Sequence, residues 1–214
     1  AASASLGSVR YMWWYVGKKT VIFDLDETLI HCNDTLTPPF DVKLPITFPT
    51  GEVIEAGINI RPHAQEILKN LSRYFEIIVF TASHSCYANV VLDYLDPTGE
   101  FIHHRLFREH CYQTPEGMYC KDLRVLDRDM TEMVLVDNAA YSYAAQPDNG
   151  IPILPYYHGK ADFELKALER YLQQMVLAKD VRTVNRKTFQ LHNYRNYYGE
   201  PERLVEELYI REEN

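Results

Sequence analysis

The chain has 214 residues, enough for one α/β domain with a substantial core or for two very small domains. Hydrophobic residues make up 46% of the sequence, which excludes an intrinsically disordered chain. The formal net charge of −8 argues against non-specific nucleic-acid binding, so we expect no direct nucleic-acid partner.

No apolar run in the sequence is long enough to span a membrane, and no signal peptide is recognisable, although an anchor upstream is not excluded. Four cysteines are widely spaced and form no C-x-x-C motif, so we expect reduced thiols rather than a zinc site or a disulfide framework. They are Cys32, Cys86, Cys111 and Cys120.

Apolar runs, prolines and glycines divide the chain into alternating strands and helices. The predicted strands, in chain order, are Thr20–Phe23, Phe40–Phe48, Glu52–Ile60, Glu76–Phe80, Arg105–Arg108, Glu132–Val136 and Ile151–Leu154. The second and third should pair as a hairpin, and Glu109–Tyr119 should form another. The predicted helices are His63–Tyr74 with Pro62 at its first position, a helix capped by Ser83 and running to Leu95, and a helix capped by Asp162 and running to Met175.

This alternation predicts a Rossmann-like α/β fold, with a central parallel sheet and helices on both faces. The first hairpin directly follows the first strand, so it should lie over the carboxyl edge of the sheet as a lid or substrate platform. We expect an N-terminal extension over residues 1–18, a single domain over 19–184 and a C-terminal extension over 185–214. In that extension Glu202–Ile210 has apolar residues at helical spacing, which predicts a docked terminal helix or, alternatively, a partner-binding motif.

Polar residues follow three of the predicted buried strands. They are Asp24, Asp26 and Thr28 after the first strand, Thr81 and Ser83 after Glu76–Phe80, and Asp137 and Asn138 after Glu132–Val136. Because the carboxyl ends of parallel strands meet at one edge of a sheet, these side chains should converge on a single site.

The residue types at this site suit phosphoryl transfer. Mg2+ would offset the repulsion between Asp24 and Asp26, with Asp24, a main-chain carbonyl near Asp26, and Asp137 or Asn138 as oxygen ligands. One carboxylate of the pair can act as a nucleophile while the other moves protons. A phosphoryl group also needs hydrogen-bond donors and positive charge, which Thr81 and Lys121 can supply. For Asp24 and Asp26, the alternative to a phosphoryl-transfer site is an acidic turn that caps the next helix. For Lys121, the alternative is an ordinary surface lysine.

The ordered motifs DLDET, FTAS, YCKDL and LVDN resemble those of the haloacid dehalogenase superfamily. More narrowly, they are similar to its FCP/SCP branch of protein serine phosphatases, which includes the small C-terminal-domain phosphatases and the nuclear-envelope enzyme Dullard. The similarity runs from about Lys19 to Val184, and it includes Arg61-Pro62-His63, RLFREHC at Arg105–Cys111 and PDNGIP at Pro147–Pro152. This resemblance implies a haloacid dehalogenase fold with β-hairpin insertions as a small cap.

The resemblance also implies an activity: Mg2+-dependent hydrolysis of phosphoserine or phosphothreonine in a protein or peptide, through an aspartyl-phosphate. Asp24 would be the nucleophile and Asp26 the acid and base, with Thr28 orienting Asp26. Thr81, Lys121 and Arg108 would bind the substrate. Mg2+ would lie on Asp24, the Asp26 carbonyl and Asn138, with Asp137 beside it.

The chain differs from this family in one loop. Small C-terminal-domain phosphatases hold a substrate proline in an apolar pocket formed partly by the loop after the first motif. Here that loop reads Cys32-Asn33-Asp34-Thr35 and is polar throughout, which argues against a preference for RNA polymerase II heptad repeats.

Two alternative functions remain open from the sequence. One is a small-molecule phosphatase of the same superfamily, although such enzymes usually carry a larger cap. The other is a non-catalytic binding protein like the mitochondrial import receptor with this domain, although such a protein has no need of paired buried acids. We expect a monomer in the nucleus or cytoplasm, with the nuclear envelope as an alternative location.

Overall fold

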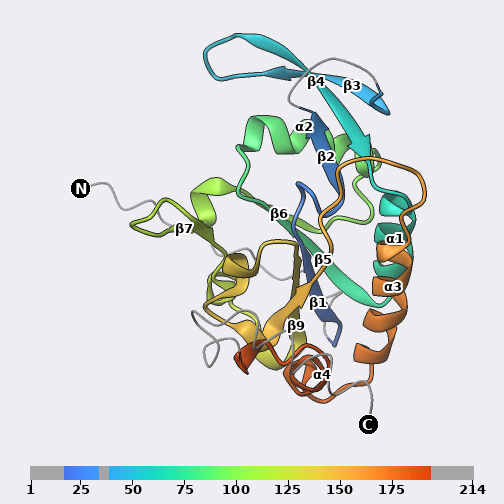
Figure 1. The fold of residues 1–214 in the computed structure, drawn as a ribbon, viewed down its shortest axis with the longest axis vertical. Coiled ribbons are helices and arrows are strands. Elements are labelled where there is room, and N and C mark those ends of the chain that lie inside the picture. Colours follow the sequence, from blue (N-terminus) through green and yellow to red (C-terminus); the bar gives the residue numbers. More distant parts are fainter. Residues whose placement is uncertain (1–16, 34–38, 194–214) are drawn as a thin grey trace, which may run out of the picture.

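The computed structural model describes residues 17–33 and 39–193 (Figure 1). Within these residues the main sheet has five parallel strands in the order β10-β9-β1-β5-β6. The strands are β1 (Lys19–Phe23), β5 (Phe75–Phe80), β6 (His104–Leu106), β9 (Met133–Asp137) and β10 (Gly150–Pro152). The predicted parallel sheet is therefore confirmed, with the first strand of the chain at its centre.

The central strands are almost fully buried because both faces of the sheet are covered. Val21 and Phe23 of β1 pack on the face that carries α1 (Ala64–Leu71), α2 (Ser85–Leu95) and α3 (Glu164–Met175). Ile22 packs on the opposite face, against residues of the short 3-10 helices η3 (Leu123–Leu126) and η5 (Ala140–Tyr143). This burial holds β1 firmly and thereby fixes the position of the residues that follow it.

Two antiparallel additions lie outside the main sheet. The predicted first hairpin is confirmed as β3 (Val42–Thr47) and β4 (Val53–Ile60), and it projects at the top of Figure 1. A strand that the sequence analysis did not anticipate, β2 (Ile30–Asn33), pairs with the other edge of β4. The second predicted hairpin is shorter than expected, with β7 (Tyr112–Gln113) pairing with β8 (Tyr119–Cys120).

Two predicted helix starts were wrong. Helix α1 begins at Ala64 after His63, which has a φ of 71°, so Pro62 precedes the helix instead of opening it. Helix α2 follows His84, and Ser83 does not cap it because its hydroxyl donates to Asp26. The second difference arises because a contact distant in sequence, the one with Asp26, takes the Ser83 hydroxyl.

Helix α4 (Val181–Thr188) was not predicted, and it crosses residue 184, where we expected the domain to end. Its Asn185 is 1% exposed and donates to the main-chain carbonyls of Asp148 and Gly150. The predicted terminal helix Glu202–Ile210 lies outside the described residues. In the described part of the chain, no helix is both long and apolar enough to cross a membrane.

Candidate active site

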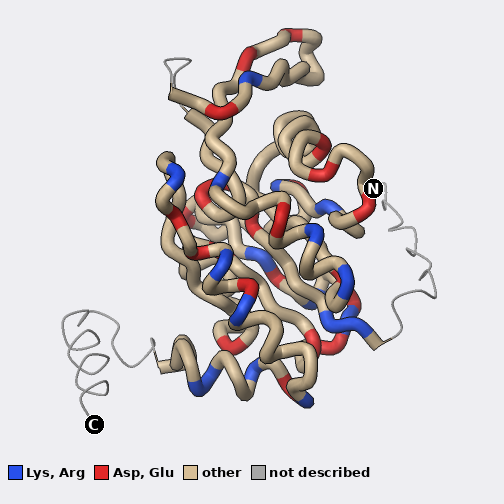
Figure 2. The backbone as a smooth tube through the Cα atoms, turned by 90° about the vertical axis from the view of Figure 1, so that its right-hand side faces the viewer, with Lys and Arg blue, Asp and Glu red and all other residues tan. Residues whose placement is uncertain are grey.

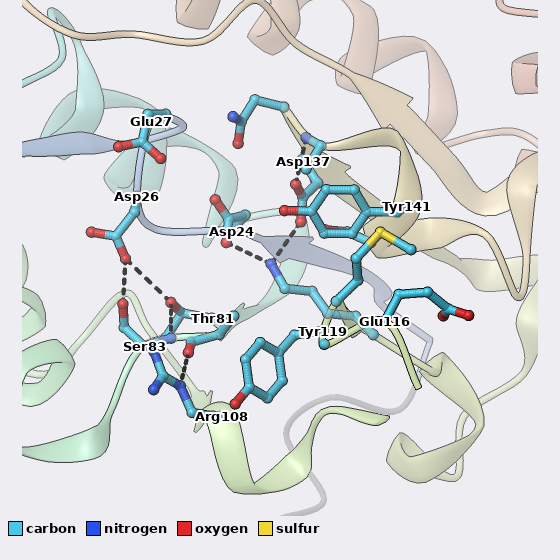
Figure 3. Close-up of a pocket in the computed structure, with 17 residues that line it drawn as sticks. Asp24, Asp26, Glu27, Thr81, Ser83, Arg108, Glu116, Tyr119, Asp137 and Tyr141 are labelled. Carbon is cyan, nitrogen blue, oxygen red and sulfur yellow. Dashed lines mark hydrogen bonds and ion pairs between the residues drawn. The ribbon is translucent and has the colours of Figure 1, made fainter. Parts of the chain in front are cut away.

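The carboxyl edge of the main sheet brings together residues at the ends of its three central strands (Figure 3). Asp24 comes directly after β1, Thr81 follows β5, and Asp137 is the last residue of β9. They line a cavity of about 430 Å³. The other predicted site residues at this cavity are Asp26, Arg108, Lys121 and Asn138.

Lys121 lies at the centre of this site. Its Nζ donates to Asp24 Oδ1 at 2.5 Å and to Asp137 Oδ2 at 2.6 Å, although only 1% of the residue is exposed. The main chain at Lys121 is held on both sides, since its N–H donates to the Ser142 carbonyl and its own carbonyl accepts from Gln146. The interpretation of Lys121 as a surface lysine is therefore wrong.

The site has more negative than positive charge around Asp24. Burial raises the pKa of Asp24 to about 7; the carboxylates of Asp137 and Asp26 contribute to the rise, and Lys121 opposes it. Burial alone would lower the pKa of Lys121, but Asp24 and Asp137 outweigh it and raise that pKa. One ammonium group thus faces three carboxylates, and a divalent cation would compensate the excess charge.

Three hydroxyl groups hold the carboxylate of Asp26. Ser83 Oγ donates to Oδ2 at 2.7 Å, Tyr87 OH donates to Oδ1 at 2.8 Å, and Thr81 Oγ1 lies 3.4 Å from Oδ2. Figure 3 shows the Asp26 side chain directed toward Ser83 and Thr81. Tyr87 was not among the predicted site residues, because nothing in the local sequence shows that its hydroxyl reaches Asp26, 61 residues away.

A tight turn connects Asp24 to Asp26 and Thr28. The N–H groups of Leu29 and Ile30 both donate to the Leu25 carbonyl, and Glu27 has a φ of 56°. Thr28 is fully buried, and its hydroxyl lies 3.4 Å from Asn138 Oδ1 as a donor. In the structure Thr28 therefore contacts Asn138, whereas the resemblance implied that it orients Asp26.

Arg108 lies at the rim of the cavity and is held from three directions. Its Nε donates to the Ala82 carbonyl at 2.6 Å, its Nη1 lies 2.9 Å from His84 Nε2, and its guanidinium stacks over the Tyr119 ring at 5.1 Å. Arg108 is thus placed to meet an anion that enters the cavity.

The residues present fit a hard divalent cation. Asp24, Asp137 and Asn138 offer carboxylate and amide oxygens at one edge of the sheet, the donors that Mg2+ prefers. Among the described residues, no three side chains of His, Cys, Asp or Glu form a metal-binding cluster, so Mg2+ here would also need the Asn138 amide or main-chain oxygens.

Comparisons with known proteins agree with this arrangement. The family described as NLI interacting factor-like phosphatase matches residues 19–182. The chain is 41% identical over 181 residues to "CTD small phosphatase-like protein 3" of Caenorhabditis elegans, covering 84% of this chain and 62% of that protein. It is 37% identical over 170 residues to the human "Carboxy-terminal domain RNA polymerase II polypeptide A small phosphatase 1", covering 79% of this chain and 64% of that protein.

Other comparisons extend this likeness. The chain is 33% identical over 192 residues to "CTD nuclear envelope phosphatase 1 homolog" of Drosophila melanogaster, covering 86% of this chain and 78% of that protein. The solved structure of Fcp1, an RNA polymerase II CTD phosphatase, shares the fold, with a TM-score of 0.55 at 22% identity over 75% of this chain and 48% of that chain. The chain spans 30% to 62% of the length of three of the curated relatives it matches.

The likeness that the motifs indicated is thus confirmed over most of the sequence. The chain belongs to the NLI interacting factor-like phosphatase family, the FCP/SCP branch of the haloacid dehalogenase fold.

Proposed function

We propose that this protein is a Mg2+-dependent phosphatase that removes phosphate from phosphoserine or phosphothreonine in proteins, through an aspartyl-phosphate on Asp24. The observation that carries the proposal is the buried Asp24–Lys121–Asp137 arrangement beside Asp26 in an accessible cavity. An ion pair with a purely structural role would not need a second carboxylate, Asp26, held beside it by hydroxyl groups. Phosphoryl transfer needs both a nucleophile and a proton donor, which the two carboxylates can supply.

The first step transfers the phosphoryl group to the protein. A carboxylate oxygen of Asp24 attacks phosphorus, and the bond between phosphorus and the serine oxygen breaks. Asp26 in its protonated form gives its proton to that oxygen, so the serine leaves as an alcohol. Lys121 and Thr81 hold the phosphoryl oxygens, with Lys121 stabilising the charge that develops on them.

The second step regenerates the enzyme. Asp26, now ionised, takes a proton from a water molecule while the water oxygen attacks phosphorus. The bond between phosphorus and Asp24 breaks, and inorganic phosphate leaves. Ser83 and Tyr87 hold the Asp26 carboxylate during both steps, and Thr28 holds the turn that carries it.

Mg2+ would be held by Asp24, Asn138 and the Asp26 main-chain carbonyl, with Asp137 beside it. When bound, it would supply positive charge that offsets the phosphate dianion and brings it up to Asp24. The need for it follows from the charge at the site, where one buried lysine faces three carboxylates before any phosphate enters.

A phosphorylated protein is the substrate that the surroundings of the cavity favour. The described additions to the fold are a three-stranded sheet and one short hairpin, neither of which is a separate cap domain that could enclose a small molecule. The relatives named above include phosphatases of an RNA polymerase domain, which is one candidate substrate here. Asp34, the polar residue that argues against a heptad-repeat preference, lies outside the described residues.

The partners and location follow from the same reasoning. Figure 2 shows Lys and Arg interspersed with Asp and Glu along the described chain, an arrangement that does not favour nucleic acid. We propose a location in the nucleus or cytoplasm, because relatives include an RNA polymerase II phosphatase and a nuclear-envelope phosphatase homolog. We also propose that the protein is a monomer.

The test is phosphate release from a panel of phosphoserine and phosphothreonine peptides with Mg2+, comparing the wild type with Asp24→Asn. A set of phosphosugars serves as the control for a small-molecule phosphatase. We expect turnover of peptides by the wild type and none by the variant. Turnover of phosphosugars alone would contradict the substrate class, and no turnover of any compound would contradict the activity.

A further inference from the structure

The rim of the active-site cavity carries acidic side chains that the proposed reaction does not use. Five carboxylates line the cavity against two cations. The carboxylates belong to Asp24, Asp26, Glu27, Glu116 and Asp137, and the cations to Lys121 and Arg108. Lys121 is already bound to Asp24 and Asp137. Among the described residues that line the cavity, Arg108 is therefore the one remaining cation that could offset the charges of Glu27 and Glu116.

Most of these carboxylates have partners within the described residues. Glu27 pairs with His31 at 3.0 Å, and Asp26 accepts from three hydroxyl groups. Glu116 is exposed, and the ion pairs and side-chain hydrogen bonds found among the described residues do not include it. Its carboxylate is therefore available to a bound substrate.

The turn that carries Glu116 has a defined shape. The Thr114 N–H donates to the Met118 carbonyl at 2.8 Å, and the Gly117 N–H donates back to the Thr114 carbonyl at 2.9 Å. Gly117 has a φ of 88°, which favours glycine. The ring of Pro115 fixes the φ angle of the residue directly before Glu116. This turn joins β7 to β8, which runs directly into Lys121, so Glu116 keeps its place relative to the catalytic lysine.

Apolar side chains lie on the same rim. Met118 is 41% exposed and Tyr141 is 46% exposed, and both line the cavity with Glu116. Figure 3 shows Glu116 and Tyr141 on the same side of the cavity, across from Asp26. A long cationic side chain suits such a surface, because its methylene groups can pack on Met118 and Tyr141 while its charged end reaches a carboxylate.

We infer that the site selects phosphopeptides with an arginine or lysine close to the phosphorylated residue, and that Glu116 binds that cation. This inference deepens the proposed function and rests on it. An acidic residue at the same place in a peptide would be repelled by Glu116, so the enzyme should discriminate against it. The contacts of Arg108 with Ala82, His84 and Tyr119 hold its guanidinium at its own part of the rim, so its attraction for an anion should favour a different peptide position from the one that Glu116 reads.

The experiment measures kcat/KM for phosphoserine peptides of nine residues with an alanine background. Each peptide carries one Arg or one Glu at one of the three positions on either side of the phosphoserine. The best Arg position should exceed its Glu counterpart about three- to ten-fold at low salt, as expected for attraction in one peptide and repulsion in the other at a partly exposed site. The ratio should fall toward one at high salt.

The variant Glu116→Lys should invert this ratio. Glu100→Lys is the matched control, because Glu100 is exposed, does not line the cavity and gives the same change in net charge. The control should keep the wild-type ratio. Equal kcat/KM for Arg and Glu peptides in the wild type, or equal changes in the two variants, would overturn the inference.

A small substrate separates this inference from the proposed function. p-Nitrophenyl phosphate has no flanking residues, so its turnover reports the phosphatase activity alone. If the wild type hydrolyses it but treats all peptides alike, the inference about Glu116 is wrong and the proposed activity stands. If the wild type hydrolyses neither it nor any peptide, the proposed function itself has failed.

Discussion

Breaking the buried ion pair between Arg61 and Asp162 by removing one partner should strongly destabilise the protein. Arg61 is 1% exposed, and its Nε and Nη2 donate to the two carboxylate oxygens of Asp162, each at 3.0 Å. Its Nη1 donates to the Thr28 carbonyl at 3.1 Å, so the pair also holds the turn next to Asp26. Replacing Asp162 with Asn would leave a buried guanidinium without its counter-charge.

The expected loss of unfolding free energy is about 2–4 kcal/mol. Breaking a fully buried pair by removing one partner costs about 3–5 kcal/mol, and we reduce this range because the Asp162 side chain is 20% exposed. Asn can still accept the hydrogen bond that the Glu164 N–H gives to Asp162 at 3.1 Å. The substitution Asp162→Asn therefore removes the charge while it keeps the acceptor at the start of α3.

Urea unfolding followed by far-UV circular dichroism measures this loss. With an m-value of about 3 kcal/mol/M, the midpoint should fall by about 1 M. Asp180→Asn is the matched control: Asp180 also accepts an N–H at a helix start and pairs with Arg182, but their side chains are 29% and 38% exposed. It should cost at most about 1 kcal/mol. An equal effect of the two substitutions would refute the reasoning.

Three further outcomes follow from the structure. The Arg128, His104 and Thr20 contacts of Glu76 outweigh its burial and hold its pKa well below its ordinary value of 4.5. The wild type should therefore be about 2 kcal/mol more stable than Glu76→Gln above pH 5. In acid-unfolding measurements this difference should shrink as the pH falls below 4.5, and an unchanged difference at pH 3 would contradict the prediction. Tyr87→Phe removes a hydrogen bond to Asp26 and should lower kcat about ten-fold with little change in KM, whereas wild-type kinetics would exclude a positioning role. EDTA should abolish phosphate release and added Mg2+ should restore it; full activity in EDTA would argue against a metal.

The strands that position the site could be predicted because their signal is local. Continuous apolar runs mark β1, β5 and β9, and each is followed by a polar residue at the carboxyl edge. Lys121 could be proposed from the positive charge that a phosphoryl site needs, but nothing around it in sequence shows that it is buried between Asp24 and Asp137. Its place depends on the sheet, which brings Lys121 next to Asp24, 97 positions away in sequence, and next to Asp137, 16 positions away.

The elements that sequence reasoning missed depend on distant partners. Strand β2 exists because β4 offers it an edge, and four residues reading IHCN carry no strand pattern of their own. Helix α4 has few apolar residues and is held in part by Asn185, whose amide bonds two distant carbonyls. Ser83 was assigned to a helix cap because that is the common role of serine before a helix, yet Asp26, 57 residues away, takes its hydroxyl.

The central claim is that Asp24 carries the phosphoryl group during turnover. The most direct measurement uses Asp26→Asn with p-nitrophenyl phosphate, whose leaving group needs no proton, so the first step can proceed while hydrolysis lacks its base. After acid quenching and borohydride reduction, an aspartyl-phosphate becomes homoserine, which tandem mass spectrometry can locate. We expect homoserine at position 24, more of it than in the wild type, and none in a variant that also carries Asp24→Asn. Homoserine at another aspartate would contradict the assignment of the nucleophile, and burst-free turnover with no trapped phosphoenzyme would contradict the covalent mechanism.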